Sequence, residues 1–283
     1  MSWSYWSDVF ALLGEYIRLT LIDPVMDVIV DGEQVADRLD EVSIVDVRDA
    51  WEYEGIGHLP GAVNIPFDSF RSEETGEEGM LPGAEAFAEL LSENGIGNED
   101  TIVAYDDTHG VFAARFLVTC ELYGHPREQL HLLNGDYSSW NRSYEVSRDA
   151  PDVPSANYEA AFVEGGPLIG LSAVESAMDD SDAVLVDTRE EWEFEEGHIP
   201  GAIRLDWLEL VDQEERGLKL ETEIRSLLEE RDITPDRHVV LYCNTARRIS
   251  HTYTVLRHLG YENLAFYEGS LTEWEEEGGQ LTT

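Results

Sequence analysis

Short apolar runs alternate with helical patterns along most of the chain. Four of these runs are continuous and β-prone, at residues 42–47, 101–105, 183–186 and 238–242. Such runs suit strands that are covered on both faces of a sheet. Helical patterns lie between them, at residues 83–94, 222–231 and 246–259, and the last stops at Gly260, which suits a helix C-cap. We therefore predict an α/β fold with a mainly parallel sheet flanked by helices, whose active site lies where strands end.

The chain also contains an internal repeat. The segment IVDVRDAWEY at residues 44–53 is echoed by LVDTREEWEF at residues 185–194, and the turn GHLPGA that begins at Gly57 returns as GHIPGA at Gly197. Two further pairs follow downstream: IVAYD with VVLYC, at residues 102–106 and 239–243, and GDYSSW with GSLTEW, at residues 135–140 and 269–274. So many matches in the same order indicate two copies of one domain.

The repeats divide the chain into four parts. We predict one domain over residues 25–145 and a second over residues 162–281, joined by an acidic, proline-containing linker at residues 146–161. The amino-terminal residues 1–24 lack a basic region, and Glu15 and Arg18 interrupt their apolar stretch. These residues therefore predict neither a secretory signal nor a membrane span, but an additional amphipathic helix.

Charge is the most unusual feature of the composition. There are 60 acidic and 18 basic side chains, a net charge of −42, and Lys219 is the only lysine. This balance excludes a nucleic-acid-binding protein that relies on a broad basic surface. The carboxylates are spread along the chain, and molar salt, which shortens the screening length to about 3 Å, would suppress their repulsion. The composition resembles that of soluble proteins from extreme halophiles, so we expect a salt-rich cytoplasm.

The two cysteines have different settings. Cys243 follows a predicted buried strand and precedes a helix, where converging backbone N–H groups and the helix dipole favour a thiolate. Arg247 and Arg248 add positive charge, so Cys243 is a candidate nucleophile, with simple packing as the alternative. Cys120 lies in a mostly apolar helical stretch without neighbouring cations, and we predict that it belongs to the core. Two cysteines are too few for a disulfide scaffold or a metal cage, and we expect no metal or other cofactor.

These motifs together resemble the rhodanese-type sulfurtransferases. The resemblance rests on Asp-x-Arg followed by Trp-Glu-Phe, on Gly-His-Ile-Pro-Gly-Ala, and on a six-residue loop opened by Cys243, and it spans residues 25–281. Asp106 stands in the first copy where Cys243 stands in the second, which is similar to the two-domain thiosulfate and 3-mercaptopyruvate sulfurtransferases. The resemblance implies a catalytically silent first domain and a second domain that carries a persulfide on Cys243.

The resemblance also assigns roles to the loop. It implies that a small anionic sulfur donor such as thiosulfate gives its sulfur to Cys243, and that cyanide or a thiol accepts it in a second step. Backbone N–H groups of the loop hold the persulfide, and Arg247 and Arg248 hold the donor unless one of them pairs with a carboxylate. In the first copy, Asp106 satisfies the corresponding N–H groups. The expected substrate-binding residues are Asn244, Thr245, Ala246, Arg247 and Arg248.

Other duplicated residues indicate structural support. Asp187 and Arg189 recur as Asp46 and Arg48 in the copy that lacks the cysteine, which favours an ion pair under the loop over substrate contact. The histidines of the two Gly-His turns, His58 and His198, are predicted to be structural for the same reason. His251 and His258 could share a helix face, but two histidines without a third ligand are a weak metal site.

The sequence departs from the family at the donor site. Two-domain members commonly have an arginine four positions beyond Arg189, where this chain has Glu193, and Ala246 replaces a usual glycine. The donor therefore stays open between thiosulfate and 3-mercaptopyruvate, and a sulfur-relay protein without fast turnover is the alternative of a different class. Cysteine phosphatases and arsenate reductases use Cys-x5-Arg, but the sixth residue after Cys243 is Ile249. The shorter Cys-x4-Arg spacing to Arg248 therefore favours a sulfur atom as the bound group over a phosphate or arsenate.

We expect the protein to unfold when salt is removed, because repulsion between the carboxylates returns as the screening length grows. Circular dichroism and tryptophan fluorescence, followed while KCl is dialysed from molar to millimolar concentration, measure this loss. A cooperative unfolding transition that persists in dilute buffer would contradict the halophilic interpretation.

Overall fold

The apolar runs form two parallel sheets in a computed structural model that describes residues 26–72, 80–244 and 246–283. The strands of the first sheet are β1 (Ile29–Val30), β2 (Ser43–Asp46), β3 (Val63–Asn64), β4 (Ile102–Tyr105) and β5 (Leu130–Leu133). Those of the second are β6 (Leu168–Ile169), β7 (Ala183–Asp187), β8 (Ile203–Arg204), β9 (His238–Tyr242) and β10 (Leu264–Tyr267). The spatial orders, β1-β5-β4-β2-β3 and β6-β10-β9-β7-β8, are equivalent. The predicted α/β architecture with duplicated parallel sheets is confirmed.

Helices connect and cover the strands. In the first half they are α2 (Gly32–Ala36), α3 (Ala50–Gly55), α4 (Ala84–Glu93), α5 (Val111–Leu122) and α6 (Tyr137–Trp140), with 3-10 helices η1 (Phe67–Phe70) and η2 (Arg127–Gln129). In the second half they are α7 (Leu171–Met178), α8 (Glu191–Glu196), α9 (Glu221–Glu229), α10 (Arg247–His258) and α11 (Ser270–Glu276), with the 3-10 helix η3 (Trp207–Leu210). The helices predicted at residues 83–94, 222–231 and 246–259 are confirmed to within two residues, and Gly260 follows α10 with φ of 85°.

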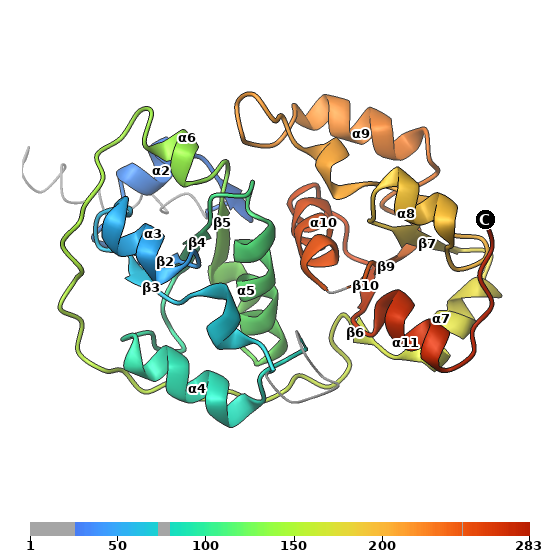
Figure 1. The fold of residues 1–283 in the computed structure, drawn as a ribbon, viewed down its shortest axis with the longest axis horizontal. Coiled ribbons are helices and arrows are strands. Elements are labelled where there is room, and N and C mark those ends of the chain that lie inside the picture. The colour runs from blue at the N-terminus through green and yellow to red at the C-terminus, as the bar shows by residue number, and fades with distance from the viewer. Residues whose placement is uncertain (1–25, 73–79, 245) are drawn as a thin grey trace, which may run out of the picture.

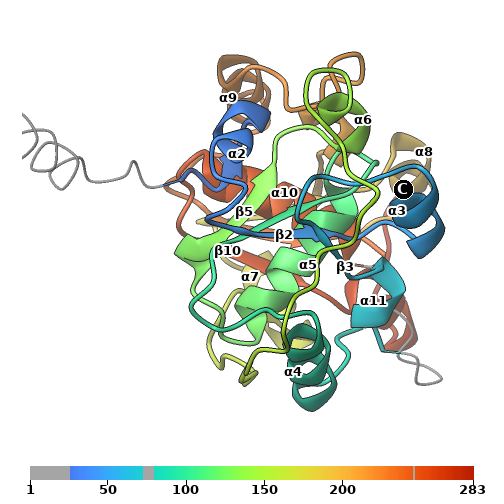
Figure 2. The same ribbon diagram turned by 90° about the vertical axis from the view of Figure 1, so that its left-hand side faces the viewer.

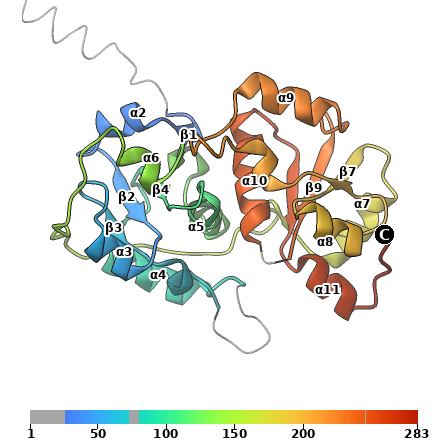
Figure 3. The same ribbon diagram turned by 45° about the horizontal axis from the view of Figure 1, so that its top comes forward.

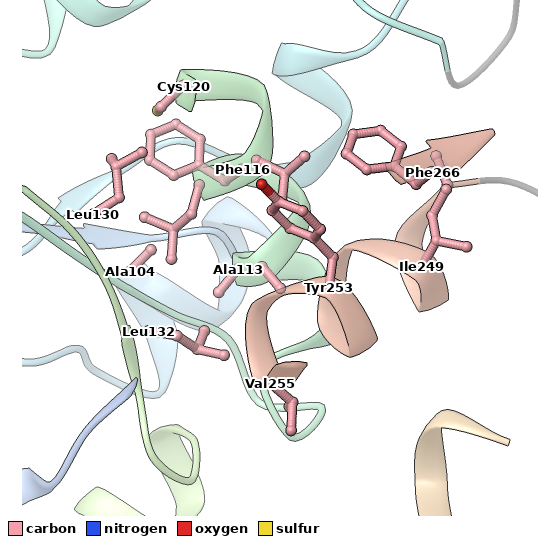
Figure 4. Close-up of a cluster of buried hydrophobic side chains, with 14 of the residues drawn as sticks. Ala104, Ala113, Phe116, Cys120, Leu130, Leu132, Ile249, Tyr253, Val255 and Phe266 are labelled. Atoms are coloured by element: carbon pink, nitrogen blue, oxygen red, sulfur yellow. The ribbon is translucent and has the colours of Figure 1, made fainter. Parts of the chain in front are cut away.

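Two long helices, α5 and α10, lie between the sheets and pack on each other (Figures 1 and 3). Seen from the side of the first domain, α5 lies behind its own sheet (Figure 2). Ten of its twelve residues are buried, because one face covers the sheet and another meets α10. Figure 4 shows Ala113 and Phe116 of α5 with Leu130 and Leu132 on one side and Tyr253 of α10 on the other. A helix in this position needs apolar residues all round, which explains why the stretch lacks a polar face.

Cys120 belongs to this interior, as predicted. It lies on α5, has no exposed surface, and burial raises the pKa of its thiol well above the ordinary value. A protonated, enclosed thiol is a packing residue rather than a nucleophile.

Charged residues also cross from one domain to the other. Arg115 of α5 forms an ion pair with Glu268, which follows β10, and both side chains are buried. Arg257 of α10 lies 2.9 Å from a carboxylate oxygen of Glu121, and Arg216 lies 2.6 Å from one of Asp136. The Arg115–Glu268 pair is buried and therefore needs exacting geometry, so it helps to fix how the two domains sit against each other.

The segment that joins the domains runs without helix or strand over residues 148–167. It is nevertheless attached to the first domain: the N–H of Ala156 donates to Ser92 (2.9 Å), and that of Val163 donates to Leu122 (2.9 Å). Tyr158 in its middle is buried. The predicted limits of the linker, and of the domains, stay predictions, and the predicted extension at residues 1–24 lies outside the described residues. No helix in the described part of the chain is long and apolar enough to cross a membrane.

One buried histidine at the domain interface makes stability depend on pH. His251 on α10 has no exposed surface, neither ring nitrogen has a hydrogen-bond partner within the described structure, and its ring meets Trp207 edge to face at 5.1 Å. Burial lowers the pKa of His251 to about 3, and His109 contributes to this. The folded protein therefore keeps this ring neutral where an unfolded chain takes up a proton.

We expect the free energy of unfolding to fall as the pH falls from about 6.5 towards 3, by up to about 1.4 kcal/mol per pH unit from His251 alone. Denaturant unfolding of the wild type and of His251→Phe, each followed over this range in molar KCl, isolates that contribution, because other groups titrate in both proteins. His258→Phe, at the partly exposed end of the same helix, is the control. Parallel pH profiles for wild type and His251→Phe would refute the assignment.

Candidate active site

The predicted nucleophile lies at the junction of β9 and α10. Its backbone is fixed, because the Cys243 N–H donates to Ser270 Oγ (3.2 Å) and the Cys243 carbonyl accepts from Leu271 N (3.1 Å). Ala246 just before α10 has φ of 60°, a left-handed conformation that costs a non-glycine residue roughly 1–2 kcal/mol. The equivalent residue of the first copy, His109, has φ of 56°, so both loops have a left-handed residue at this position. The first loop continues with a second one, Gly110, whereas α10 already begins at the equivalent Arg247. Thr245 lies outside the described residues.

The loop of the first copy shows where its N–H groups point. The Asp106 carboxylate accepts from the N–H groups of Thr108 (2.7 Å), Gly110 (2.8 Å), Phe112 (2.7 Å) and Ala113 (3.1 Å). Burial raises the pKa of Asp106, and these four donors oppose the rise. The prediction that Asp106 satisfies the loop of the first copy is confirmed. A loop of this shape therefore surrounds one anionic group with backbone donors.

Strand register brings the Asp-x-Arg motif to the same edge. Asp187 pairs with Tyr242 across β7 and β9, so it lies beside the residue that precedes Cys243. Arg189 is buried and donates from Nε (2.9 Å) and Nη2 (2.6 Å) to Asp187, and from Nη2 to the carbonyl of Gly197 (2.7 Å). Asp46 and Arg48 form the same ion pair in the first copy. The predicted structural ion pair is thus confirmed in both domains.

The histidines of the two Gly-His turns also serve the fold. The ring of His58 stacks on Tyr53 at 3.9 Å, and that of His198 stacks on Phe194 at 3.6 Å. Each is held by one backbone carbonyl, Leu59 for His58 and Phe194 for His198.

The two loop arginines have different environments. Arg248 donates to Glu193 from Nη1 (2.5 Å) and from Nη2 (2.9 Å), and Asn244 donates to the same carboxylate (2.9 Å). Arg248 is therefore paired with a carboxylate from α8. For one of the two arginines, the sequence had left such a pairing open as the alternative to donor binding. Burial works to raise the pKa of Glu193, but the hydrogen bonds from Arg248 and from the N–H of Glu190 outweigh it and hold the pKa below its ordinary value.

Arg247 points the other way, toward the first domain. Its guanidinium lies 5.3 Å from the ring centre of Phe112 and 5.9 Å from that of Phe67, within cation–π range. No carboxylate of the described residues lies within ion-pairing distance of it. Arg247 borders a cavity of about 390 Å³, which also contains Arg71 and Asp106. Arg247 is thus the loop cation that is available to an anionic ligand.

A second cavity, of about 460 Å³, lies beside Asn244 and Glu193 and is bordered by Trp192. Cys243 borders neither cavity and has no exposed surface. The side chains above the loop must therefore move before any ligand reaches the sulfur. Within the described parts of the chain, no group of three or more His, Cys, Asp or Glu side chains is arranged to hold a metal ion.

Sequence reasoning did not identify three contributors to this site. Ser270 fixes the backbone of Cys243, and Phe67 and Phe112 of the other domain support Arg247. Phe67 and Phe112 carry no local signal, because they are apolar residues in apolar stretches more than 130 positions from Arg247.

Most of the chain is similar to known proteins. Residues 31–143 and 171–277 match the rhodanese-like domain. A thiosulfate sulfurtransferase of Pseudomonas aeruginosa is 30% identical over 260 residues, covering 88% of this chain and 94% of that protein. Another from Corynebacterium glutamicum is 34% identical over 239 residues, covering 77% of each. The crystal structure of the 3-mercaptopyruvate sulfotransferase of Escherichia coli superposes with a TM-score of 0.77 at 25% identity, covering 87% of this chain and 99% of that one. With its two copies of the matching domain, the chain belongs to the rhodanese family of sulfurtransferases.

Proposed function

We propose that the protein transfers the outer sulfur of thiosulfate to a thiophilic acceptor such as cyanide, through a persulfide on Cys243. The observation that carries this proposal is the Asp106 carboxylate, which receives four backbone N–H bonds in the loop of the first copy. The second loop has a left-handed residue, Ala246, at the position of His109, and it has a thiol at the position of Asp106. A thiolate or a persulfide there would take the place of that carboxylate.

In the first half-reaction the Cys243 thiolate attacks the outer sulfur of thiosulfate. A new sulfur–sulfur bond forms to Sγ, the sulfur–sulfur bond of the donor breaks, and sulfite leaves with the bonding electron pair. The product carries its negative charge on the outer sulfur, where backbone donors stabilise it without any side-chain movement.

In the second half-reaction the carbon of cyanide attacks this outer sulfur. A carbon–sulfur bond forms, thiocyanate leaves, and the electron pair of the broken persulfide bond returns to Cys243 as thiolate. Because the first product leaves before the acceptor reacts, the kinetics are expected to be ping-pong.

Arg247 binds the anionic donor in this proposal. It is supported by its position in the loop, by the absence of a carboxylate partner in the described part of the chain, and by its place at a cavity. Asn244 and Arg248 shape the loop through Glu193. The relatives named thiosulfate sulfurtransferase favour thiosulfate, and 3-mercaptopyruvate is the alternative donor.

We also propose that this reaction takes place in a cytoplasm rich in salt. The net charge of −42 and the single lysine support this proposal. At such salt concentrations a charged side chain acts on a ligand only at short range, so donor recognition depends on direct contact with Arg247 rather than on long-range attraction.

Replacement of the nucleophile separates the two cysteines. Cys243→Ser is expected to abolish thiocyanate formation from thiosulfate and cyanide, because the hydroxyl cannot carry the transferred sulfur, whereas Cys120→Ser keeps it. After incubation with thiosulfate in the absence of cyanide, mass spectrometry should show one added sulfur atom in Cys120→Ser and none in Cys243→Ser. Equal loss of activity in both variants would refute the assignment of Cys243.

The same assay, repeated with 3-mercaptopyruvate, decides between the donors. A wild-type protein with a titratable thiol that forms no product from either donor would support the sulfur-relay alternative.

Arg247→Gln is expected to raise the KM for thiosulfate roughly tenfold, because it removes a charge-assisted contact worth about 1.5 kcal/mol. The kcat should change much less, since the persulfide is held by backbone donors. Arg148→Gln, at an exposed arginine of the segment that joins the domains, changes the net charge equally and serves as the control. A KM that is the same in the two variants would exclude Arg247 from donor binding.

A further inference from the structure

Glu193 is the residue that connects both ends of the active-site loop. It projects from α8, is only 9% exposed, and accepts hydrogen bonds from Asn244, directly after the cysteine, and from Arg248, at the start of α10. The N–H of Glu190 donates to it as well (3.1 Å) and so fixes the carboxylate from its own helix. The side chain is thus part of the site, although it is negatively charged and the expected donor is an anion.

The first copy provides a natural comparison. Glu52 occupies the same motif position and accepts from the N–H of Asp49 (3.3 Å). The residues equivalent to Asn244 and Arg248 are Asp107 and Val111, so Glu52 has no ion pair in the described structure. Burial raises the pKa of Glu52 although the N–H of Asp49 and the charge of Arg48 oppose the rise, and the net direction is opposite to that of Glu193. Among the described residues, this glutamate forms an ion pair in the cysteine-bearing copy and not in the first copy.

Both loop arginines interact electrostatically with Cys243. Burial works to lower the pKa of Arg248, but its hydrogen bonds to Glu193 and its interaction with Cys243 raise it above its ordinary value. The interaction with Cys243 also works to raise the pKa of Arg247, but burial and the charge of Arg71 outweigh it and hold that pKa below its ordinary value. Of these two arginines, Glu193 pairs with and neutralises Arg248.

We propose that Glu193 is a specificity-determining residue that masks the charge of Arg248, so that Arg247 alone presents an uncompensated cation to the donor. This inference rests on the proposed function. A masked site discriminates against donors of high charge: it weakens the binding of a dianion such as thiosulfate more than that of a monoanion such as 3-mercaptopyruvate. It also limits how strongly the loop stabilises the thiolate of Cys243.

The test uses Glu193→Gln, which keeps the shape and hydrogen-bonding capacity of the side chain and removes its charge. Glu52→Gln is the matched control, since it makes the same change at the duplicated position. The KM for thiosulfate is expected to fall about three- to tenfold in Glu193→Gln, with a smaller fall for 3-mercaptopyruvate and no change in Glu52→Gln. Addition of Arg248→Met to Glu193→Gln should remove this gain, because it removes the unmasked charge.

A second measurement does not depend on turnover. In a Cys120→Ser background, the rate of iodoacetamide alkylation of Cys243 is followed against pH in molar KCl. In Glu193→Gln the midpoint of this profile should move to lower pH, since an uncompensated Arg248 stabilises the thiolate. Glu52→Gln should leave the midpoint unchanged.

The possible results separate the inference from the proposed function. A higher or unchanged KM together with an unmoved alkylation midpoint in Glu193→Gln would show that Glu193 only supports the loop, and would overturn the masking role. A wild type that is inactive with both donors would overturn the proposed function, and the alkylation profile would still decide the role of Glu193.

Discussion

A short loop whose backbone N–H groups converge on one negative charge is the arrangement on which the rest of this molecule depends. In the first domain the group at the centre is the Asp106 carboxylate, which takes four N–H bonds in the interior. Both loops contain a non-glycine residue in the left-handed conformation. The parallel strands β4 and β9 end beneath the loops, and a buried Asp–Arg pair fixes each edge, so the sheets act as rigid supports for the two loops.

The first domain also forms part of the surroundings of the Cys243 loop. Its helix α5 packs on α10, its Phe67 and Phe112 support Arg247, and its Arg115 forms a buried ion pair with Glu268 near the end of β10. In the same way, Trp207 of the second domain lies close to His109 in the loop of the first domain. The domain that has Asp106 in place of the cysteine therefore supplies part of the surface around the other loop.

Much of this arrangement could be predicted, because it depends on residues that are close in sequence or duplicated. The apolar runs predicted the strands. The Asp-x-Arg motif also occurs in the copy without the cysteine, and this indicated that its two residues form a structural ion pair in each domain. The partner of Arg248 could not be predicted, because Glu193 is 55 residues away and only the register of β7 and β9 brings α8 to the loop. The complete burial of Cys243 matches the packing alternative that the sequence left open beside the nucleophile.

The attached linker has a practical consequence for anyone who divides the protein. Tyr158 is buried beside His125, with the two rings parallel at 5.8 Å, although it lies beyond the last helix of the first domain. A fragment that stopped after that helix would expose the surface that Tyr158 covers and would lose the hydrogen bonds to Ser92 and Leu122. The natural place to cut is therefore beyond Val163, and an insoluble shorter fragment would say nothing about whether the domain can fold independently.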